Sequence, residues 1–594
     1  MTEKYVTITI NGKEVKAKAD ATILETADAI GVRIPRLCHH PKLPNIAACR
    51  VCIVEVEGMR VYPPSCCTPV AEGMKISTHS PGVMEARRDI VELILDNHPK
   101  DCQICERANS CDLQDLSQTL GIREFLFEGA RKSFPEDRSS PSVVRDQDKC
   151  ILCGKCVRVC AEIQGVNALS YINRGFRTTV GPAYDMPAAE SVCINCGQCT
   201  LFCPTAALAE KDDTGRVWEA LKDPKKTVVV QIAPAVRVAV GEGFDMEPGT
   251  NTTGKIVTAL RLLGVETVFD TQFSADLTIM EEGHELIKRL SGKGKLPMFT
   301  SCSPGWIKFC EIFHPEFLEN VSTCKSPQQM MGALIKTYWA EKKGIAPENI
   351  FSVSIMPCTA KKFEAARPEM NASGRQDVDV VLTTRELIRM IRQAGIRFGE
   401  LEDGVFDDAL GESTGAAPIF GATGGVMEAA LRTAYEVVTG KELKDVNFTA
   451  VRGFDGIKEA EVDLAGTKLR CAVAYGLANV HKLLTEIKEG KRQYHFVEIM
   501  TCPGGCLGGG GQPHPKGLVD PMDRSWYEKR AKGLYGIDEE KKYRKSHENP
   551  QIKQIYAEFL KEPLGHQSHK LLHTSYAARA PKGIPAPVKE TVSI

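Results

Sequence analysis

The sequence predicts an α/β domain that is preceded by several small cysteine-rich modules of mixed α and β structure. Sixteen of the 23 cysteines precede residue 204, most of them in tight CxxC-type groups. After Asp223-Pro224 the cysteines thin out, and short strand-like runs alternate with helical ones. This alternation is typical of a largely parallel sheet. Three of the strand-like runs end directly in a cysteine motif, which indicates a site built from several strand ends.

Composition restricts the possible functions. The 594 residues are 43% hydrophobic and carry a net charge of −1, so we expect roughly three to five folded domains and no bulk attraction to nucleic acid. The first residues lack an apolar signal core and a twin-arginine signal, and no apolar run could span a membrane. We therefore expect a cytoplasmic protein, in which clustered cysteines are metal ligands rather than disulfides.

The first module is expected over residues 1–80. Tyr5 to Ile10 alternates as a strand, Asn11-Gly12 is a type I′ hairpin turn, and Val15 to Ala17 lies on the return strand. Ala21 to Ile30 is expected to be a helix closed by Gly31. Four cysteines follow: Cys38, Cys49, Cys52 and Cys66.

These cysteines resemble the β-grasp ferredoxin arrangement for a 2Fe–2S cluster, although the first spacing is longer than the plant-type CxxxxCxxC. Cys67, next to Cys66, leaves the fourth ligand ambiguous. We prefer Cys66, because its spacing from Cys52 fits the related subunits of complex I and hydrogenases. A zinc site is the alternative interpretation.

The second module, residues 81–135, starts with an amphipathic helix over Val83 to Asn97. The sequence HPKDCQICERANSC comes directly after it and resembles the His-ligated 4Fe–4S cluster of complex I-type subunits. An imidazole in place of a thiolate makes such a cluster less negative, which raises its potential. The expected ligands are His98, Cys102, Cys105 and Cys111.

The third module, residues 136–222, carries the runs CILCGKCVRVC and CINCGQCTLFCP. The pair resembles a two-cluster 4Fe–4S ferredoxin, in which the fourth cysteine of each run ligates the other cluster. One expected set is Cys150, Cys153, Cys156 and Cys203. The other is Cys193, Cys196, Cys199 and Cys160.

The α/β domain is expected over residues 223–520, where sites form at the carboxyl ends of parallel strands. Three strands end in the motifs MFTSCSPGW, SIMPCTAKKFE and VEIMTCPGGCLGGGGQP. The expected strands are Thr227–Ile232, Thr267–Asp270, Pro297–Thr300, Ser352–Met356, Val378–Leu382 and Phe496–Met500. The expected helices are Gly254–Leu263, Asp276–Leu290, Pro327–Lys343 and Val426–Thr439.

These three motifs resemble the signatures of the FeFe-hydrogenases, TSCCPxW, MPCxxKxxE and ExMxCxGGCxxGGGxP. The resemblance covers almost the entire chain and is strongest to the catalytic subunits of NAD(P)-linked, multisubunit, often electron-bifurcating members. It implies reversible interconversion of H₂ with protons and electrons. It also implies an H-cluster, a 4Fe–4S cubane bridged by one cysteine to a diiron unit that carries CO, cyanide and an azadithiolate. Two lobes of strands and helices would surround this cluster, and electrons would pass through one 2Fe–2S and three further 4Fe–4S clusters.

The resemblance assigns roles residue by residue. Cys358, Cys502 and Cys506 match cubane ligands, and Cys506 is the expected bridge. Cys302 matches the proton-shuttling cysteine, and Lys361 matches the lysine that hydrogen-bonds a cyanide. The positions that match the lining of the diiron unit are Pro234, Ser326, Gln328, Met356 and Met500. Those that match the proton path are Glu282, Ser322, Glu285 and Arg289. The acidic residues and Arg289 share one helix face, and a solvated surface stripe is the alternative interpretation.

One position departs from the family pattern, because Cys302-Ser303 replaces the Cys-Cys pair of the first motif. Ungapped alignment places Ser303 on a cubane ligand. Ser303 could ligate iron as an alkoxide, which is the explanation we favour. Alternatively Cys310 or Cys324 compensates, or Cys302 ligates and the proton relay differs. Cys310 and Cys324 otherwise fill space as small buried hydrophobic residues, as Cys471 does.

The Gly508–Gly511 run lacks the Lys-Ser/Thr of a phosphate loop and is expected to let backbone approach a cluster. Because no nucleotide-binding motif was found, we expect a flavin- and NAD-binding partner subunit and a small 2Fe–2S subunit, with ferredoxin as a further partner. An electron-transfer subunit of the complex I type, a hydrogen sensor and an iron–sulfur assembly factor are the rival interpretations.

The last segment, residues 521–594, resembles the small-subunit segment that wraps the catalytic domain in this family. Residues 525–573 are polar and expected to be helical, and His573 lacks ligand spacing, so it is interpreted as structural. The Pro-rich end from Ala580 is expected to be extended or disordered.

Overall fold

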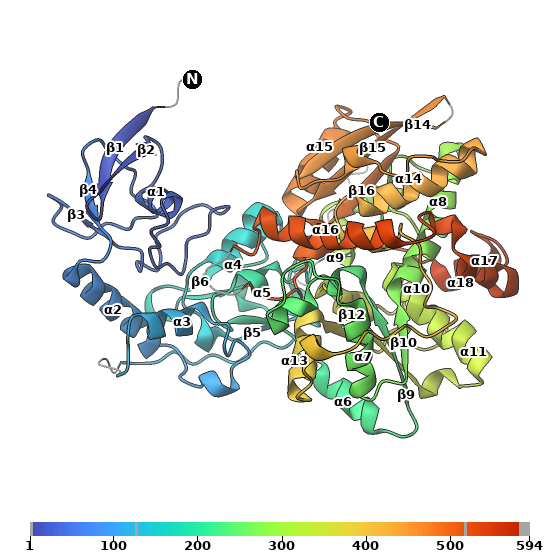
Figure 1. Cartoon of the computed structure of the whole chain (residues 1–594), viewed down its shortest axis with the longest axis horizontal. Coiled ribbons are helices and arrows are strands. Elements are labelled where there is room, and N and C mark those ends of the chain that lie inside the picture. The colour runs from blue at the N-terminus through green and yellow to red at the C-terminus, as the bar shows by residue number, and fades with distance from the viewer. Residues whose placement is uncertain (1–3, 125–126, 128, 465, 516–519, 581–594) are drawn as a thin grey trace, which may run out of the picture.

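The computed structural model describes residues 4–124, 127, 129–464, 466–515 and 520–580. The prediction for the Pro-rich end lies almost entirely outside this range. In Figure 1 the N-terminal modules follow one another from one end of the long axis toward a larger α/β body. That body contains two sheets, and the C-terminal helices lie against it.

The N-terminal module is a four-stranded sheet with one helix. The expected hairpin is confirmed: β1 and β2 pair in antiparallel fashion, and Asn11 (φ 51°) and Gly12 (φ 82°) form the left-handed turn between them. The helix α1 begins two residues later than expected, because Thr22 and Glu25 form a reciprocal capping box there. The sheet order is β2-β1-β4-β3, with β1 (Tyr5–Ile10), β2 (Lys13–Lys18), β3 (Glu55–Val56), β4 (Lys75–Ser77) and α1 (Ile23–Ala29).

The next module packs onto the first through a buried arginine. Arg87 lies on α2 (Pro81–Asp96), and its guanidinium donates to the backbone carbonyls of Val51 (3.1 Å) and Ile53 (2.5 Å). The short helix η1 (Cys102–Ile104) and α3 (Asp112–Thr119) follow.

The third module is built around two short helices that each start after a left-handed glycine, Gly154 (φ 65°) or Gly197 (φ 68°). A side chain at either position would be strained, so the sequence CxxCGxC suits this turn. The elements are β5 (Val143–Arg145), α4 (Lys155–Arg158), a π-helical turn (Val159–Ile163), β6 (Ser170–Ile172), β7 (Thr179–Gly181), α5 (Gln198–Phe202), β8 (Leu208–Glu210) and α6 (Thr214–Lys222). β5 pairs with β8, so the two ends of the module meet.

The α/β body contains two four-stranded sheets. The first, β10-β9-β12-β13, is entirely parallel, as expected. The second has the order β11-β16-β15-β14, and only β14 runs antiparallel. The strands are β9 (Thr227–Ile232), β10 (Thr267–Asp270), β11 (Met298–Phe299), β12 (Ile350–Met356), β13 (Val380–Thr383), β14 (Ile457–Leu464), β15 (Thr467–Tyr475) and β16 (Phe496–Met500).

β16 is buried on both faces. Val497 and Ile499 pack into one core cluster, whereas Phe496 and Met500 pack into another. This two-sided burial explains the continuous apolar run that predicted the strand. The helices of the body are α7 (Thr253–Leu262), α8 (Thr271–Leu290), α9 (Pro304–Phe313), α10 (Pro327–Leu334), α11 (Ala340–Lys343), α12 (Ala360–Ala365), α13 (Thr384–Gln393), α14 (Gly425–Thr439) and α15 (Leu477–Lys488).

The C-terminal segment is part of the α/β body. In Figure 1 α16 (Arg524–Glu540) crosses the body between the two sheets, with α17 (Pro550–Ile555) and α18 (His566–Leu572) beside α10. Arg432 on α14 is fully buried and donates to Asp538 of α16 (2.8 Å) and to Glu428 (2.8 Å). No helix among the described residues is long and apolar enough to cross a membrane.

Candidate functional site

The three cysteine motifs of the α/β body meet at one cavity. Cys302, Cys358 and Cys502 follow the carboxyl ends of β11, β12 and β16, and all three line this cavity. The expected site residues that line it are Pro234, Cys302, Ser303, Gln328, Met356, Cys358, Lys361, Met500, Cys502 and Cys506. The site therefore forms where strand ends from both sheets converge.

The donors in this cavity fit an iron–sulfur centre. Burial raises the pKa of the Cys506 thiol to about 12, and burial, followed by the neighbouring Cys358 and Cys506, also raises the pKa of Cys502. Such thiols stay protonated until a metal displaces the proton. Several soft sulfur donors in an apolar pocket are a suitable ligand set for an iron–sulfur cluster.

Ser303 lies in this cavity together with the cysteines. Its hydroxyl is 2.8 Å from the Thr501 hydroxyl and accepts a hydrogen bond from the Thr501 backbone N–H (3.2 Å). The thiols of Cys310 and Cys324 do not line the cavity. Cys310 donates to the His314 carbonyl at 3.3 Å, and Cys324 faces Glu285. The geometry thus favours Ser303 or Cys302 as the residue at the fourth ligand position. It disfavours compensation by Cys310 or Cys324.

Lys361 is held by a compact polar cluster. Its ammonium donates to the Cys302 carbonyl (3.0 Å) and to Glu364 (2.9 Å). These contacts use two of its three hydrogens, so one remains for a group in the cavity. Glu364 also accepts from Ser326 (2.9 Å) and Gln328 (3.1 Å). Ser326 therefore stands behind the cavity wall and positions Glu364 rather than lining the cavity.

The acidic residues of α8 form a buried series rather than a solvated stripe. Glu282, Glu285 and Arg289 are 1%, 6% and 6% exposed, so the alternative of a solvated surface stripe is wrong. Glu285 accepts from the Ser322 hydroxyl (2.8 Å) and pairs with Arg289 (2.6 Å). The carboxylate oxygens of Glu282 have no hydrogen-bond partner among the described residues. Burial, followed by the charge of Glu285, raises the pKa of Glu282 to about 8.

The raised pKa of Glu282 predicts a descending limb in the plot of activity against pH. Glu282 holds its proton below about pH 8, so any reaction in the cavity that takes protons from Glu282 should slow as the pH rises through that value. The substitution Glu285→Gln removes a like charge and should move the limb to lower pH, in addition to slowing the reaction. The measurement is the pH profile of the turnover rate at the central site, normalised to each variant's maximum. An unmoved limb would show that Glu282 is not the titrating group.

Two further cavities lie in the third module. One is lined by Cys150, Cys153, Cys156 and Cys203. The other is lined by Cys160, Cys193, Cys196 and Cys199. In each cavity three cysteines come from one run and the fourth comes from the other run. The arrangement matches the two expected ligand sets.

The cavity around Cys196 touches the central site. Cys196 lines both cavities, a contact that motif spacing did not reveal. A Cβ on Gly510 would lie 2.2 Å from the Cys196 carbonyl oxygen, so only glycine permits this approach. Gln198 also donates to the Gly508 carbonyl (2.8 Å). The glycine run thus lets the loop that follows β16 pack directly on the third module.

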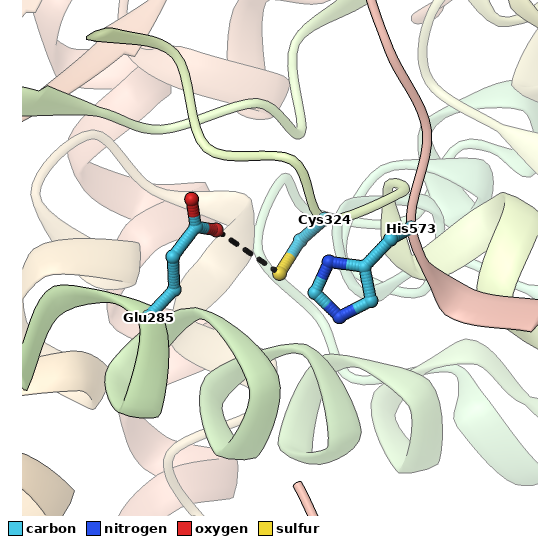
Figure 2. A group of neighbouring side chains, drawn as sticks. All are labelled: Glu285, Cys324 and His573. Atoms are coloured by element: carbon cyan, nitrogen blue, oxygen red, sulfur yellow. Dashed lines mark hydrogen bonds between the residues drawn. The ribbon is translucent and has the colours of Figure 1, made fainter. Parts of the chain in front are cut away.

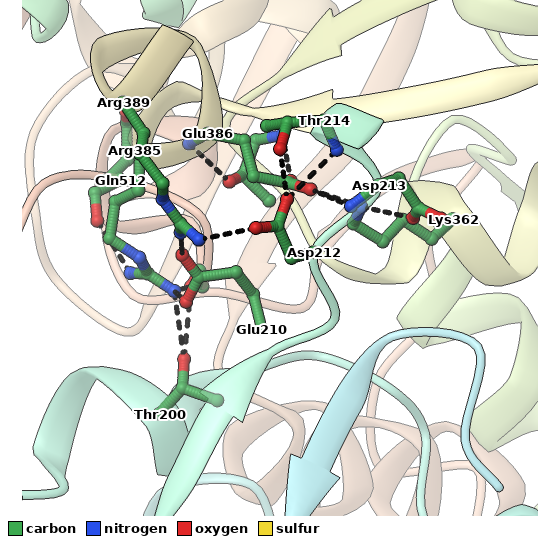
Figure 3. A network of polar contacts seen from close by, with 12 residues as sticks. Thr200, Glu210, Asp212, Asp213, Thr214, Lys362, Arg385, Glu386, Arg389 and Gln512 are labelled. Carbon is green, nitrogen blue, oxygen red and sulfur yellow. Dashed lines mark hydrogen bonds and ion pairs between the residues drawn. The ribbon is translucent and has the colours of Figure 1, made fainter. Parts of the chain in front are cut away.

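Figure 3 shows the polar network that joins these two parts of the chain. Arg385 of α13 donates to Glu210 of β8 (2.7 Å) and to the carbonyls of Gly510 (2.9 Å) and Gln512 (2.8 Å). Burial alone would raise the pKa of Glu210, but the charge and hydrogen bond of Arg385 and the charge of Arg389 together outweigh burial, and the pKa falls to about 2. The ion pair therefore fixes the third module against the central site.

The cysteines of the first module also lie together. The Cys49 backbone N–H donates to the Cys38 sulfur (3.5 Å). Cys66 is 1% exposed, whereas its neighbour Cys67 is exposed with its sulfur 3.6 Å from that of Cys66. Of the two residues, Cys66 is thus the one that faces the core with Cys52.

The expected ligands of the second module are less buried than those of the first. Cys111 is buried, Cys105 is half-buried and Cys102 is exposed. The His98 Nδ1 is buried and has no hydrogen-bond partner in the described part of the chain. Burial lowers the pKa of His98 to about 4, which leaves the neutral imidazole that metals bind.

Glu498 is a structural member of the site that motif reading left without a role. It lies on β16, is fully buried, and accepts from the backbone N–H groups of Gly424 and Met427, both at 2.7 Å. These bonds hold the start of α14 beside the strand that carries Cys502. In the sequence, the sign of a role for Glu498 was its position within the third cysteine motif.

Five family models match successive parts of the chain. Residues 226–510 match the iron only hydrogenase large subunit, C-terminal domain, and residues 524–579 match the iron hydrogenase small subunit. Upstream, residues 3–81 match a 2Fe-2S iron-sulfur cluster binding domain. Residues 87–125 match the NADH-ubiquinone oxidoreductase-G iron-sulfur binding region, and residues 142–167 match a 4Fe-4S binding domain.

Similar proteins cover nearly the full length. The chain is 50% identical over 586 residues to the NADP-reducing hydrogenase subunit HndD of Solidesulfovibrio fructosivorans, covering 97% of this chain and 99% of that protein. It is 42% identical over 580 residues to iron hydrogenase 1 of Clostridium pasteurianum, covering 96% and 99%. The solved structure of the FeFe-hydrogenase HydA(deltaEFG) aligns with a TM-score of 0.55 and 44% identity, covering 62% of this chain and 99% of that one.

Proposed function

This chain belongs to the iron-only (FeFe) hydrogenases, and we propose that its central cavity holds the H-cluster and that named side chains exchange protons with it. The enzyme interconverts H₂ with protons and electrons. One observation supports the site assignment above the others: cysteines from three strand ends converge on a single apolar cavity. When bound, the diiron unit would supply the centre at which H₂ is formed or split.

Four side chains would hold the cubane. Cys358, Cys502 and Cys506 would supply thiolates, of which Cys506 would also serve the diiron unit, and Ser303 would supply the fourth position as an alkoxide. The Thr501 hydroxyl, 2.8 Å from the Ser303 oxygen, can take up a hydrogen-bonding role when the serine loses its proton. An alkoxide is a harder donor than a thiolate, so it would change the electron density on the cubane.

The substitution Ser303→Cys tests this ligand assignment. A thiolate in place of the alkoxide is expected to change the electron paramagnetic resonance spectrum of the cubane while iron content stays the same. The matched control is Thr501→Val, which removes only the hydroxyl partner of Ser303. A cubane spectrum identical in the wild type and in Ser303→Cys would refute iron ligation by Ser303.

Proton movement would follow the buried series on α8. Cys302 carries a proton between the cavity and Glu282, and Ser322 connects onward to Glu285, which Arg289 holds in place. Lys361 directs its remaining hydrogen into the cavity, where it would stabilise an anionic cyanide ligand. Met356, Met500, Pro234 and Gln328 enclose this volume and restrict water, while Ser326 fixes Glu364 beneath Lys361.

Electron transfer would use four upstream clusters in the order of the chain. We assign a β-grasp 2Fe–2S domain to residues 1–80, a His/Cys 4Fe–4S domain to 81–135 and a two-cluster ferredoxin domain to 136–222. The catalytic domain follows over 223–520, with the small-subunit-like segment over 521–594. The contact of Cys196 with the central cavity supports the ferredoxin cluster nearest the H-cluster as the last carrier.

Partner subunits would complete the electron path. The similar protein HndD is by name a subunit of an NADP-reducing hydrogenase. Because this chain shows no nucleotide-binding motif, we propose a flavin- and NAD(P)-binding partner subunit and a small 2Fe–2S subunit, with ferredoxin as a second electron partner.

An infrared spectrum of the anaerobically purified, matured protein tests the proposed function. Sharp CO and cyanide bands are expected from the diiron unit. Their absence from protein with full upstream clusters would instead indicate an electron-transfer or assembly role.

A further inference from the structure

Three metal-binding side chains from distant segments lie together beside the acidic series. Figure 2 shows Glu285 on α8, Cys324 on the loop before α10, and His573 just after α18. Their ligand atoms all lie within 4.8 Å of one another, and their exposures are 6%, 0% and 9%. The thiol of Cys324 points at the Glu285 Oε2 atom, 3.8 Å away.

The backbone fixes two of these residues against each other. Cys324 and His573 form an isolated antiparallel bridge. The Lys325 N–H donates to the Leu572 carbonyl (2.7 Å), and the Thr574 N–H donates to the Thr323 carbonyl (2.8 Å). A metal could therefore bind without first ordering a loop, which lowers the entropic cost of binding.

A carboxylate behind the histidine orients its ring. The His573 Nε2 atom is 3.1 Å from Glu281, and Glu281 is fully buried. Histidines that bind metals commonly donate their second ring N–H to a carboxylate in this way. The Nδ1 atom is left on the side of Thr323 (2.8 Å) and, as Figure 2 shows, faces the Cys324 sulfur.

We propose that Glu285, Cys324 and His573 form a binding site for a divalent zinc ion. Thiolate, imidazole and carboxylate are the ligand types of zinc, and three protein ligands leave a fourth position for water. Arg289 holds the Oε1 atom of Glu285, and Oε2, which accepts from Ser322 and from the Thr323 N–H, is the oxygen on the side of the Cys324 thiol. Binding displaces the thiol proton of Cys324 to solvent, and the Thr323 and Ser322 hydroxyls give up their contacts with His573 and Glu285.

Zinc at this position would inhibit the enzyme. This consequence rests on the proposed function, in which Glu285 carries protons toward Ser322 and Glu282. A carboxylate oxygen bound to zinc no longer accepts a proton, so the path is interrupted while the cavity and the clusters remain intact. The inhibition should be reversed by a chelator.

A second group, Glu436, His547 and Glu548, provides an internal comparison. Its ligand atoms also lie within 4.8 Å of one another, but the residues are only half-buried and include no thiol. Zinc bound there would lack sulfur coordination, and none of these residues belongs to the acidic series of α8.

The test uses matured holoenzyme titrated with zinc chloride under anaerobic conditions, with iron content measured before and after. X-ray absorption at the zinc edge should show one sulfur at about 2.3 Å and nitrogen or oxygen neighbours at about 2.0–2.2 Å. H₂ evolution should fall in parallel and recover with chelator. Cys324→Ala should remove the sulfur signal and raise the half-inhibiting zinc concentration at least tenfold. Glu281→Gln, which neutralises the carboxylate behind His573 and keeps its size, should weaken inhibition by about 10–100-fold.

Two matched controls separate the outcomes. Cys310→Ala removes another fully buried thiol, and His547→Gln removes the second group; both should keep inhibition unchanged. Zinc without sulfur coordination in the wild type, or equal binding to Cys324→Ala, would overturn the site. Sulfur-bound zinc with undiminished H₂ evolution would support the site and refute the role of Glu285 in proton transfer.

Discussion

Replacing Cys302 by alanine is expected to lower the rate of H₂ evolution by a factor of about 10²–10⁴, the usual contribution of a positioned proton carrier. Cys302 lines the cavity, and burial, followed by the nearby Glu282, raises the pKa of its thiol well above the usual value. It therefore holds a proton at the junction between the cavity and the acidic series. The measurement is H₂ evolution with a chemical reductant.

The spectra of the variant distinguish a proton carrier from an iron ligand. Unchanged iron content and an unchanged cubane spectrum are expected in Cys302→Ala, since Ser303 is the proposed ligand. Cys302→Asp, which retains a proton-carrying group, should recover part of the rate. Cys310→Ala removes a buried thiol outside the cavity and should keep full activity. Full activity in Cys302→Ala would exclude this residue from proton transfer.

The largest loss of stability is expected for Arg385→Met. Removing one partner of a buried ion pair costs about 3–5 kcal/mol when the other charge stays buried without compensation, and the remaining contact of Glu210 with Arg389 should keep the loss near the lower end of that range. Glu210 would lose its 2.7 Å contact, and the carbonyls of Gly510 and Gln512 would lose their donor. The measurement is the midpoint of anaerobic urea unfolding, followed by absorbance of the clusters.

Arg389→Met is the matched control, because Arg389 also contacts Glu210 (3.0 Å) but its side chain is 28% exposed. Partly exposed pairs contribute about 0–1 kcal/mol, so its midpoint should shift far less. Equal shifts in the two variants would show that the buried contact of Arg385 does not hold the modules together.

The elements that could be predicted from sequence are those whose local pattern agrees with their final environment. β9, β10 and β16 have the predicted limits, since each is a short apolar run that is buried in a parallel sheet. The hairpin of β14 and β15 was missed. Its first strand, IKEAEVDL, carries four charged residues at the sheet edge, and its antiparallel pairing departs from the parallel pattern expected for this domain.

The residues of the candidate site also fall into those that the sequence pattern could predict and those that it could not. Cysteines that follow strands could be assigned to a common edge, because strand direction alone brings them together. The approach of Cys196 to the central cavity depends on how two modules dock, and only the glycine run that includes Gly510 hinted at it. The pairing of Cys324 with His573 joins segments far apart in the chain, and neither carries a ligand motif.

The burial of Arg432 has a consequence for biosynthesis. Its partner Asp538 lies on α16, and Glu281 of α8 likewise contacts Tyr556 and His573 near the end of the chain. Translation delivers these partners last, so Arg432 has only Glu428 as a partner, and Glu281 lacks Tyr556 and His573, until the ribosome has nearly finished. Completion of the α/β body therefore comes after that of the upstream modules, which are synthesised first.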